Sequence, residues 1–427
     1  MTQAVVVEPS VRLRGQLRVP GDKSASHRAL MISSLASGSS TIEGLSQGHD
    51  VRSTGIIMGQ LGASVVEVED VMHVRGPEGG LRATDEMLDC GNSGTTMRLL
   101  CGLVSAVEGT HHLIGDPSLS KRPMDRVATP LGLMGSVVRG IGERVNAPLT
   151  ITGSRSLKGI DYHVPTASAQ VKSAILFAGL GARGETTVRE DIRTRTATED
   201  MFVEAGVDVE SRDEGLGRVV TLKPGRPTTA SWQIPGDPSQ AAFFCVLGAV
   251  HPDAHIEILN VDSSVERSGF VAVLQRMGAT LTREARGHYS SLVSSSSELA
   301  ATEIHAHEIP SVDEVPVLTV AAAAAKGVSA FRGMGELRLK ESDRFEGSMS
   351  LARSLGCRVW SEGDDFFVEG LGSSSAFVGF EIDAALDHRL VMSAAVAGAA
   401  GRGCTIVGAE TVASSYPQFF HDLDSLQ

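Results

Sequence analysis

The hydrophobic positions of the chain repeat in a regular pattern. A stretch rich in Ala and Leu is followed by a turn of small residues and then by a β-branched segment, and this order occurs six times, first over residues 35–42 and last over residues 395–406. Such an order predicts helices that alternate with strands. The turn residues lie about 69 to 76 positions apart. They are Gly38, Gly109, Gly184, Asp253, Gly327 and Gly403.

A second pattern runs in phase with the first. In it a helical segment ends at a glycine and an alternating strand follows, as in residues 60–65. A glycine just after a helix is expected to stop the helix in the left-handed conformation. Two patterns with one spacing indicate an internal repeat. The glycines of the second pattern, about 71 to 78 positions apart, are Gly62, Gly135, Gly206, Gly278 and Gly356.

The number of copies predicts the fold. The first pattern has six copies and the second has five, because the chain ends soon after the sixth helix begins near residues 414–420. Strand-like segments at residues 4–7 and 11–19 have no helix before them and are available to complete the last copy. We therefore expect an α/β fold of six βαβαββ units of about 71 residues each. Six units in one closed arrangement and two domains of three units both fit this count.

A break in the pattern near residues 232–235 favours two domains. The N-terminal domain then comprises residues 20–234, and the C-terminal domain comprises residues 1–19 and 235–427. The chain would cross between them twice, near residues 19–21 and 233–235. Two crossing strands form a natural hinge, so we expect a ligand to bind in the cleft between the domains.

Composition and charge narrow the function. Of the 427 residues 42% are hydrophobic and 21% are charged, which is typical of a soluble globular protein. The formal net charge of −13 argues against nucleic acid as a partner, because binding it requires a broad basic face. The longest apolar stretches, residues 315–325 and 390–400, are shorter than the roughly 20 residues that span a bilayer, so no membrane partner is expected. Five cysteines without a CxxC spacing favour buried free thiols, and the first 14 residues lack a signal-peptide core, so we expect a cytoplasmic protein.

Polar clusters stand where the predicted helices begin. Ser, Asn and Asp are ordinary caps at such positions and need no function. Cations are less expected there, because the positive end of the helix dipole repels them and attracts anions. Several cations in an acidic chain therefore indicate a site for an anionic ligand, although a surface ion-pair network is an alternative for residues 340–344. These cations are Lys23, Arg28, Arg98 and Arg389, followed on the other set of helices by Lys121, Arg122, Arg126, Arg193, Arg195, Lys340 and Arg344.

No metal or nucleotide motif accompanies these cations. The histidine pairs at residues 111–112 and 305–307 lack the spacing of a helical ligand pair. A Walker loop and a GxGxxG that follows a strand are both absent from the sequence. We therefore expect an enzyme site without metal or cofactor.

The motifs at the helix starts resemble the enolpyruvyl transferase family, and within it the branch that acts on shikimate 3-phosphate. The resemblance covers essentially the whole chain, and the motifs follow in the family's order. They are Val19-Pro-Gly-Asp-Lys-Ser-Ala-Ser-His-Arg28, Cys90-Gly-Asn-Ser-Gly-Thr-Thr-Met-Arg98, Lys121-Arg-Pro-Met124, Ser168-Ala-Gln170, Pro310-Ser-Val-Asp-Glu-Val-Pro316, Glu336-Leu-Arg-Leu-Lys-Glu-Ser-Asp-Arg344 and Asp387-His-Arg389.

The resemblance implies a fold and a reaction. The family fold has two domains, each an inside-out α/β barrel of three βαβαββ repeats, with the active site in the interdomain cleft. The family reaction moves the enolpyruvyl group of phosphoenolpyruvate to the 5-hydroxyl of shikimate 3-phosphate by addition and elimination, and releases phosphate. It needs no metal, nucleotide or covalent adduct. The partners are therefore two small anionic molecules, and we expect a monomer in which the N-terminal domain mainly binds shikimate 3-phosphate.

The resemblance also assigns residues to roles. Both substrates carry a carboxylate and a phosphate, which suits Lys and the bidentate fork of Arg. Asp313 resembles the base that takes the 5-hydroxyl proton, and Glu341 and Lys23 are the other catalytic candidates, Glu341 for protons at C3 of phosphoenolpyruvate. The residues expected to hold shikimate 3-phosphate are Lys23, Ser24, Arg28, Ser168, Gln170, Arg195, Asp313 and Lys340. Those expected to hold phosphoenolpyruvate are Lys23, Gly94, Arg122, Gln170, Arg344 and Arg389.

Two departures and three rival interpretations bear on this assignment. The segment 412–417 lacks a lysine that some members use for phosphoenolpyruvate, and Leu99 stands where one branch has proline. Glyphosate-tolerant relatives have Ala at the position where this chain keeps Gly94, so we expect glyphosate to inhibit this enzyme.

The sister enzyme that acts on a UDP-sugar carries a reactive cysteine near Arg122, and here no cysteine lies between Cys101 and Cys245. A non-catalytic phosphosugar sensor would not need Asp313, and a structural scaffold would not explain the cations.

Overall fold

The computed structural model describes residues 4–264, 267–287, 289–309 and 312–427. The chain divides into two compact units. The C-terminal unit comprises Met1–Asp22 and Pro235–Gln427, and the N-terminal unit comprises Lys23–Ile234. The chain passes from one unit to the other between Asp22 and Lys23 and returns between Ile234 and Pro235. Each unit has its own hydrophobic core.

The described residues of the N-terminal unit form three repeats of one pattern. In each repeat two helices alternate with strands, and a hairpin closes the sheet. The elements are α1 (Lys23–Leu35), β3 (Gly38–Glu43), α2 (His49–Gln60), β4 (Ser64–Val68), β5 (Val71–Gly76), β6 (Met87–Asp89), α3 (Gly94–Ser105), β7 (Gly109–Ile114), α4 (Asp125–Met134), β8 (Val137–Ile141), β9 (Asn146–Gly153), β10 (Asp161–Val164), α5 (Ala169–Gly179), β11 (Thr186–Glu190), α6 (Ala197–Glu204), β12 (Val209–Glu214), β13 (Gly217–Leu222) and β14 (Ser231–Gln233).

The C-terminal unit repeats the pattern within its described residues. Its first two strands come from the start of the chain and the others follow the second crossing. The elements are β1 (Ala4–Val7), β2 (Leu13–Arg18), α7 (Pro238–Val250), β15 (Ala254–Asp262), α8 (Gly269–Arg276), β16 (Thr280–Arg286), β17 (Tyr289–Ser295), β18 (Glu303–His305), α9 (Val315–Ala324), β19 (Lys326–Arg332), α10 (Arg344–Ser354), β20 (Arg358–Glu362), β21 (Asp365–Leu371), β22 (Phe380–Asp383), α11 (His388–Ala400), β23 (Cys404–Val407) and α12 (Phe419–Asp424).

Within the described residues, five sheets share one four-stranded topology, and the sheet β1-β23-β22 has three strands. In the order β6-β7-β9-β8, for example, β6 and β7 are parallel and β9 is antiparallel to both neighbours. The strand β1 pairs with β23 from Ala4↔Val407 to Val7↔Cys404, so the start of the chain completes the last repeat, as predicted. The prediction was wrong for residues 11–19, because β2 instead pairs in parallel with β15 and opens the fourth repeat. In the same way β14, at the end of the N-terminal unit, supplies the parallel partner of β3 in the first repeat.

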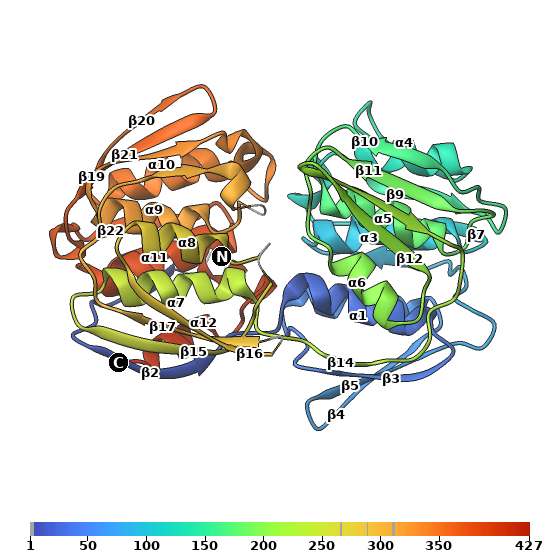
Figure 1. Ribbon diagram of the computed structural model, residues 1–427, viewed down its shortest axis with the longest axis horizontal. Coiled ribbons are helices and arrows are strands. Elements are labelled where there is room, and N and C mark those ends of the chain that lie inside the picture. The colour runs from blue at the N-terminus through green and yellow to red at the C-terminus, as the bar shows by residue number, and fades with distance from the viewer. Residues whose placement is uncertain (1–3, 265–266, 288, 310–311) are drawn as a thin grey trace. The chain divides into compact units, whose positions relative to one another are not determined.

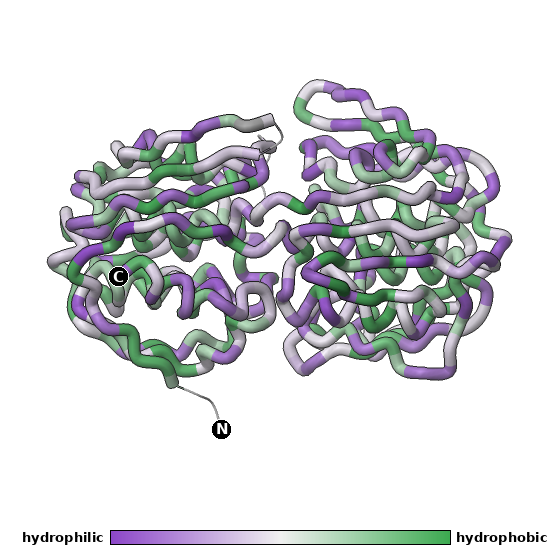
Figure 2. The backbone as a smooth tube through the Cα atoms, turned by 90° about the horizontal axis from the view of Figure 1, so that it is seen from below, coloured by the Kyte–Doolittle hydropathy of each residue, from purple (hydrophilic) through white to green (hydrophobic). Residues whose placement is uncertain are grey.

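Helices occupy the inside of each unit and sheets the outside. In the C-terminal unit α7, α9 and α11 pack against one another, and every residue of the three is buried (Figure 1). Beyond the larger polar residues of their first turns, such as Gln240 and Arg389, these helices carry apolar or small residues on all sides, and such a helix is stable only when it is buried all round. Hydrophobic and hydrophilic stretches are mixed along the whole tube in Figure 2. Buried and more exposed residues alternate along strands such as β9. Their hydrophobic face covers the helices, and their polar face meets solvent.

The predicted helix stops are confirmed. All five glycines of the second sequence pattern have positive φ, from 75° at Gly206 to 103° at Gly62. A different glycine, Gly102, permits close helix packing in the N-terminal unit. A Cβ added there would lie 1.9 Å from the backbone oxygen of Ala174, so α3 and α5 approach each other as closely as only glycine allows.

Candidate active site

The first cluster of predicted site residues begins at the N-terminus of α1. Lys23 Nζ lies 2.7 Å from Asp50 Oδ2, and both side chains are largely buried. Asp50 stands in the first turn of α2, where a carboxylate also favours the helix dipole. The ion pair holds the ammonium group of Lys23 at the start of α1.

A chain of hydrogen bonds ties three helices together behind Lys23. His27 Nδ1 lies 2.8 Å from Thr54 Oγ1, which lies 2.8 Å from Thr96 Oγ1, and Thr96 donates to Ser93 Oγ at 2.7 Å. Ser93 is also the N-cap of α3 and accepts from the backbone NH of Thr96. Burial, together with the charges of Lys23 and Arg28, lowers the pKa of His27 well below its ordinary value. His27 is therefore a neutral structural residue at the centre of α1, α2 and α3.

Gly94 begins α3 beside two guanidinium groups. A Cβ added at Gly94 would lie 3.1 Å from Nη1 of Arg122 and 3.1 Å from Nη1 of Arg98. Arg122 is buried and donates from Nη2 to Asn92 Oδ1 at 2.5 Å, and the amide of Asn92 donates in turn to Asp116. The missing side chain of Gly94 thus leaves the two arginines close to the N-terminus of α3, where free backbone NH groups also favour an anion.

Gln170 connects α5 to this part of the cluster. Its Oε1 accepts from Arg98 Nη1 at 2.6 Å, and its Nε2 donates to Thr95 Oγ1 at 2.9 Å. Ser168 is the N-cap of α5 and accepts from the backbone NH of Val171. The structure therefore brings Ser168 and Gln170, predicted from one motif, to the start of a helix that packs against α3.

Arg195 and Arg28 both contact Ser24 in the first turn of α1. Arg195 Nη1 donates to Ser24 Oγ at 3.3 Å, and Arg28 Nη1 donates to the Ser24 carbonyl at 2.8 Å. Arg28 also donates from Nε to Thr198 and from Nη2 to Ser173, and it is 3% exposed. These bonds hold the guanidinium of Arg28 against α1, α5 and α6.

A buried ion triad supports the segment that carries Arg195. Lys172 Nζ lies 2.8 Å from Glu190 Oε2 and 2.8 Å from Glu199 Oε1, and none of the three side chains is more than 2% exposed. Glu190 also accepts from Thr194, directly before Arg195. Burial, only partly offset by Lys172, raises the pKa of Glu199. The triad fixes both ends of residues 190–199 to α5.

The second cluster is centred on Arg344, at the start of α10. Its side chain is 1% exposed and contacts three carboxylates. Nη1 lies 2.9 Å from Asp313 Oδ1, Nη2 lies 2.7 Å from Glu341 Oε2, and Nε lies 2.7 Å from Asp387 Oδ2. Burial alone would lower the pKa of Arg344, but the charges of Asp387, Glu341 and Asp313 raise it above its ordinary value. The predicted acid–base pair, Asp313 and Glu341, therefore shares one buried guanidinium.

Asp313 is ionised in this setting. Burial opposes its charge, but the positive charges of Lys340, Arg389 and Arg344 outweigh burial and hold the pKa of Asp313 well below its ordinary value. Lys340 Nζ itself lies 2.8 Å from Glu336 Oε1. Val312, directly before Asp313, has a φ of 50°, which is strained for a β-branched residue. Pro310 and Ser311, which open this motif in the sequence, lie outside the described residues.

Arg389 is the cation of this cluster with unmet hydrogen-bonding capacity. It lies in the first turn of α11 and is 4% exposed, and Phe243 of α7 places its ring centre 5.9 Å from Arg389 Cζ. Within the described part of the chain Nε and Nη1 of Arg389 have no hydrogen-bond partner. A buried guanidinium whose NH groups lack acceptors is costly unless a ligand supplies them.

The structure thus collects the predicted residues into two groups, one in each unit. Sequence reasoning missed three of their partners, Asp50, Asn92 and Asp387, as interacting groups. Asp387 was noticed only as part of a motif, and Asp50 has the position of an ordinary residue in the first turn of a helix. No spacing in the sequence connects Asp50 with Lys23 or Asn92 with Arg122, so only the fold reveals these pairs.

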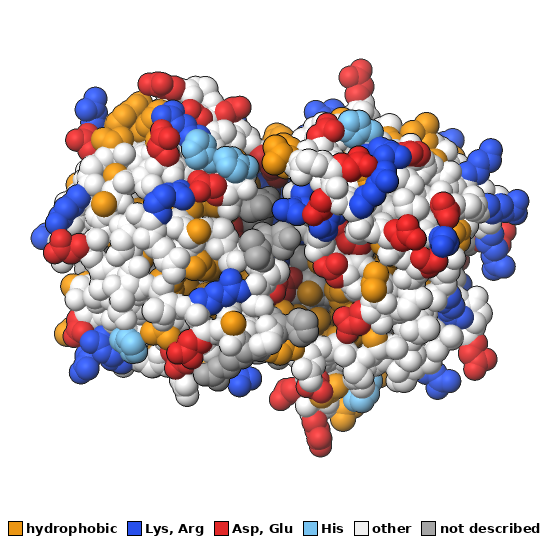
Figure 3. Space-filling view, in the orientation of Figure 1, with side chains coloured by type: hydrophobic (Ala, Val, Ile, Leu, Met, Phe, Trp, Pro, Cys, Tyr) orange, Lys and Arg blue, Asp and Glu red, His pale blue; other side chains and the backbone are white. Residues whose placement is uncertain are grey.

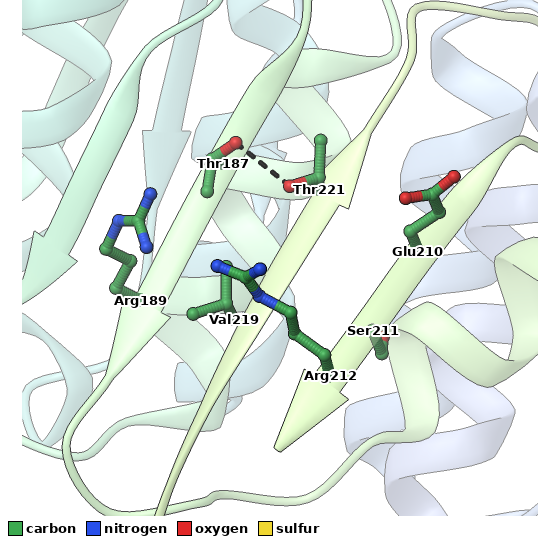
Figure 4. Close-up of a pocket in the computed structure, with 7 residues that line it drawn as sticks. All are labelled: Thr187, Arg189, Glu210, Ser211, Arg212, Val219 and Thr221. Carbon is green, nitrogen blue, oxygen red and sulfur yellow. Dashed lines mark hydrogen bonds between the residues drawn. The ribbon is translucent and has the colours of Figure 1, made fainter. Parts of the chain in front are cut away.

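Other surface features contain none of the predicted site residues. A groove of about 440 Å³ lies on the sheet of β11, β12 and β13. Its arginines are already paired, Arg189 with Asp161 and Arg212 with Glu214. Thr187, Arg189, Glu210, Ser211, Arg212, Val219 and Thr221 line the groove (Figure 4).

The described residues form neither a metal site nor a membrane-spanning helix, and the charges on the face drawn in Figure 3 are mixed. Across residues 4–264, 267–287, 289–309 and 312–427, no group of three or more His, Cys, Asp or Glu side chains is arranged to hold a metal ion. No helix in those same ranges combines the length and hydrophobicity of a membrane span. On the face shown in Figure 3, acidic and basic side chains are interspersed over each unit.

Comparisons with known proteins agree with one another. A family model described as EPSP synthase (3-phosphoshikimate 1-carboxyvinyltransferase) matches residues 7–423. The 3-phosphoshikimate 1-carboxyvinyltransferase of Acidiphilium cryptum is 40% identical over 422 residues, which cover 96% of this chain and 94% of that protein. The enzyme of the same name from Bacillus thuringiensis (strain Al Hakam) is 39% identical over 436 residues, with full coverage of both chains.

Solved structures give the same result. The EPSP synthase from Acinetobacter baumannii has a TM-score of 0.87 at 37% identity, covering 100% of this chain and 98% of that chain. The enolpyruvyl transferase NikO from Streptomyces tendae has a TM-score of 0.79 at 18% identity, with coverage of 100% and 98%. This second similarity is one of fold alone.

Proposed function

This chain belongs to the EPSP synthase family, whose members are 3-phosphoshikimate 1-carboxyvinyltransferases, and on that premise we propose which of its residues carry the reaction of the shikimate pathway. The observation that carries the assignment is the second cluster, in which Arg389 presents unpartnered NH groups beside Asp313, Arg344 and Glu341. An oxyanion of a substrate supplies the acceptors that the buried guanidinium lacks.

The bond changes define what the residues must do. The 5-hydroxyl oxygen of shikimate 3-phosphate attacks C2 of phosphoenolpyruvate while C3 gains a proton and the hydroxyl loses one. The tetrahedral intermediate then loses a proton from C3 and releases inorganic phosphate, so the enolpyruvyl double bond is restored. The enzyme must therefore bind two highly charged anions and move protons at two positions.

The residues for shikimate 3-phosphate come mainly from the N-terminal unit. Ser24 and Arg195 are hydrogen-bonded to each other at the start of α1, and Ser168 caps α5. In our proposal these groups, together with Lys23 and Arg28, bind the phosphate and hydroxyl groups of this substrate. The full set is Lys23, Ser24, Arg28, Ser168, Gln170, Arg195, Asp313 and Lys340.

Phosphoenolpyruvate is assigned to cations from both groups. Arg122 lies beside the N-terminus of α3 because Gly94 leaves the space open, and Gln170 holds Arg98 alongside. Arg344 and Arg389 lie in the second group. The full set is Lys23, Gly94, Arg122, Gln170, Arg344 and Arg389.

Asp313 acts as the base for the 5-hydroxyl in this proposal, and Glu341 handles the proton at C3, with Lys23 as a third proton-handling group. The low pKa of Asp313 is caused by cations that the substrates would neutralise. When phosphate and carboxylate groups bind to Lys340, Arg389 and Arg344, the field of these cations at Asp313 weakens and the pKa of Asp313 rises toward the range of an effective base. Substrate binding therefore switches on the basicity of Asp313.

The experiment measures inorganic phosphate released from phosphoenolpyruvate in EDTA, with shikimate 3-phosphate or a UDP-N-acetylsugar as the acceptor. Release with shikimate 3-phosphate alone supports the proposal and shows that the reaction needs no added metal. Release with the UDP-sugar alone contradicts it and favours the sister activity. Binding of shikimate 3-phosphate without any release would indicate a sensor.

The proposal includes a cytoplasmic monomer, as expected from the sequence. Sedimentation analysis at micromolar concentration should give a single species close to the chain mass of 44.8 kDa. A stable species of twice that mass would contradict the monomer.

A further inference from the structure

Three helices of the C-terminal unit begin at one place. Ser239, in the first turn of α7, donates to Glu314 Oε1 at 2.5 Å, and Glu314 directly precedes the first residue of α9. Arg344 connects the start of α9 to the start of α11 through Asp313 and Asp387. The N-termini of α7, α9 and α11 are therefore adjacent, and their dipoles favour negative charge at the same end of the bundle.

Gln240 lies at this end of the bundle, and its buried side-chain amide makes no hydrogen bond to the described residues. Its side chain is 1% exposed. Within the described part of the chain neither Oε1 nor Nε2 of Gln240 has a hydrogen-bond partner. A buried amide with an unmet donor and an unmet acceptor destabilises the folded protein. Leu or Met would fill the same space without this penalty, so the glutamine needs an explanation outside the folding of the chain.

The position of Gln240 relates it to Arg389. Gln240 precedes Phe243 by three residues on α7, and residues three apart lie on the same face of a helix. The ring of Phe243 is the one whose centre lies 5.9 Å from Arg389 Cζ. Gln240 is one turn nearer to the N-terminus of α7, and Arg389 is in the first turn of α11. Two buried side chains with unpartnered polar atoms thus occupy neighbouring helix starts.

We propose that Gln240 is a further binding residue for phosphoenolpyruvate, donating from its amide to the same oxyanion that Arg389 binds. This inference rests on the proposed function and adds a residue that the family motifs did not single out. The ligand accepts from Gln240 Nε2 and from the free NH groups of Arg389, while Gln240 Oε1 accepts from an adjacent NH of the guanidinium. Every buried polar atom of the pair is then satisfied, and the three helix dipoles stabilise the charge.

The test replaces Gln240 by residues of similar volume without an amide. Gln240→Leu and Gln240→Met remove the two unmet groups, so we expect both variants to be at least as stable as the wild type. Both variants lack the hydrogen bond that the Gln240 amide donates to bound phosphoenolpyruvate. The KM for phosphoenolpyruvate should therefore rise about 10- to 100-fold, because a hydrogen bond to a charged group is lost. The KM for shikimate 3-phosphate should change less than about twofold, because that substrate does not use Gln240. Either variant suffices if the other fails to fold.

Gln240→Glu gives a second, independent measure. A carboxylate beside Arg389 occupies the guanidinium and repels the anion, so the KM for phosphoenolpyruvate should rise further than in Gln240→Leu. Thr319→Val is the matched control, because Thr319 is equally buried in α9 but donates to the Val315 carbonyl at 2.9 Å inside its own helix. It should alter the melting temperature and leave both KM values unchanged.

An unchanged KM for phosphoenolpyruvate in all three Gln240 variants would overturn the inference. A lower melting temperature in Gln240→Leu and Gln240→Met with unchanged KM would show that the amide has a structural partner, such as a buried water. These outcomes differ from failure of the proposed function, in which the wild type itself releases no phosphate from the two substrates.

Discussion

Arg344 Nη1 lies 2.9 Å from Asp313 Oδ1 in the interior of the C-terminal unit. The same guanidinium binds Glu341 and Asp387, so a single arginine orients both carboxylates of the proposed proton transfers. Lys340, Arg389 and Arg344 together keep Asp313 ionised, and the pair with Arg344 fixes the direction of its Oδ1. Replacing Asp313 therefore changes both the charge next to Arg344 and the orientation of that guanidinium. A substitution at Asp313 should therefore keep the size of the side chain.

Asp313→Asn is expected to bind both substrates and lose most of its turnover. Asparagine keeps the size and one acceptor toward Arg344 but cannot take the 5-hydroxyl proton. A general base typically contributes about 10²- to 10⁴-fold, so kcat should fall by that factor while the KM values change much less. Steady-state kinetics measure both. The exposed Asp424→Asn is the control and should behave as the wild type. Near-normal kcat in Asp313→Asn would remove Asp313 from the role of base.

Gly94→Ala is expected to weaken the binding of both phosphoenolpyruvate and glyphosate. The new methyl group would lie 3.1 Å from the nearest nitrogen of both Arg122 and Arg98, so the arginines must move. Weakening one charge-assisted hydrogen bond raises KM and the glyphosate inhibition constant by about tenfold or more. Gly132→Ala is the matched control, because Gly132 is also helical and an added Cβ meets nothing within 4 Å. The same inhibition constant in Gly94→Ala and the wild type would show that glyphosate does not use this site.

Backbone features of the fold were accessible from the sequence. Gly62 and its four counterparts all adopt the positive φ that a helix stop requires, because only glycine takes this conformation without strain. The spacing of hydrophobic residues and the residue types in turns are local properties of the sequence. The internal repeat and the strand at residues 4–7 could therefore be predicted from them. Residues 11–19 were assigned to the wrong sheet, because local patterns do not reveal which distant strand, here β15, is the partner.

Side-chain partners were not accessible in the same way. Lys23 was predicted as a substrate ligand, but its ion pair with Asp50 joins two helices whose contact depends on tertiary packing. Lys172 gave no signal at all, since one lysine in an apolar helix is usually exposed. Its burial between two glutamates is decided by how α5 and α6 pack, and the sequence separation of 27 residues between Lys172 and Glu199 carries no periodicity.

Lys172→Met is expected to destabilise the protein strongly. The substitution leaves Glu190 and Glu199 buried without their cation, and breaking a buried ion pair from one side typically costs about 3–5 kcal/mol. Urea unfolding gives the free energy of unfolding. The triple variant Lys172→Met, Glu190→Gln, Glu199→Gln should recover a large part of the loss.

Lys223→Met is the control for this comparison. Lys223 forms an exposed pair with Asp208, so its loss should change the free energy of unfolding far less than the loss of Lys172 does. Equal losses in Lys172→Met and Lys223→Met would show that the triad contributes nothing beyond a surface pair.

The stability of the protein should fall as the pH drops below about 6.5, with His27 as one cause. Burial, with help from Lys23 and Arg28, lowers the pKa of His27 well below its ordinary value of 6.5. Below pH 6.5 the unfolded chain therefore binds a proton at His27 that the folded chain does not bind, which favours unfolding. The free energy of unfolding should decrease by up to about 1.4 kcal/mol for each pH unit per such histidine.

The pH dependence of stability that His27 causes can be distinguished from the pH dependence that Asp313 causes. Asp313, whose pKa is lowered, stabilises the fold above the ordinary pKa of an aspartate, about 3.9, and loses this effect only at lower pH. Between pH 6.5 and 5 buried histidines, His111 included, lower the stability as the pH falls, because burial lowers the pKa of His111 too. Glu199 acts in the opposite direction, because burial raises its pKa, so the contribution of His27 is obtained by comparing variants. Asparagine preserves a polar contact to Thr54, so His27→Asn should fold. Its free energy of unfolding should change less steeply with pH than that of the wild type, by the contribution of one proton. The exposed His73→Asn should keep the wild-type slope, and identical slopes in wild type and His27→Asn would show that His27 binds its proton equally in both states.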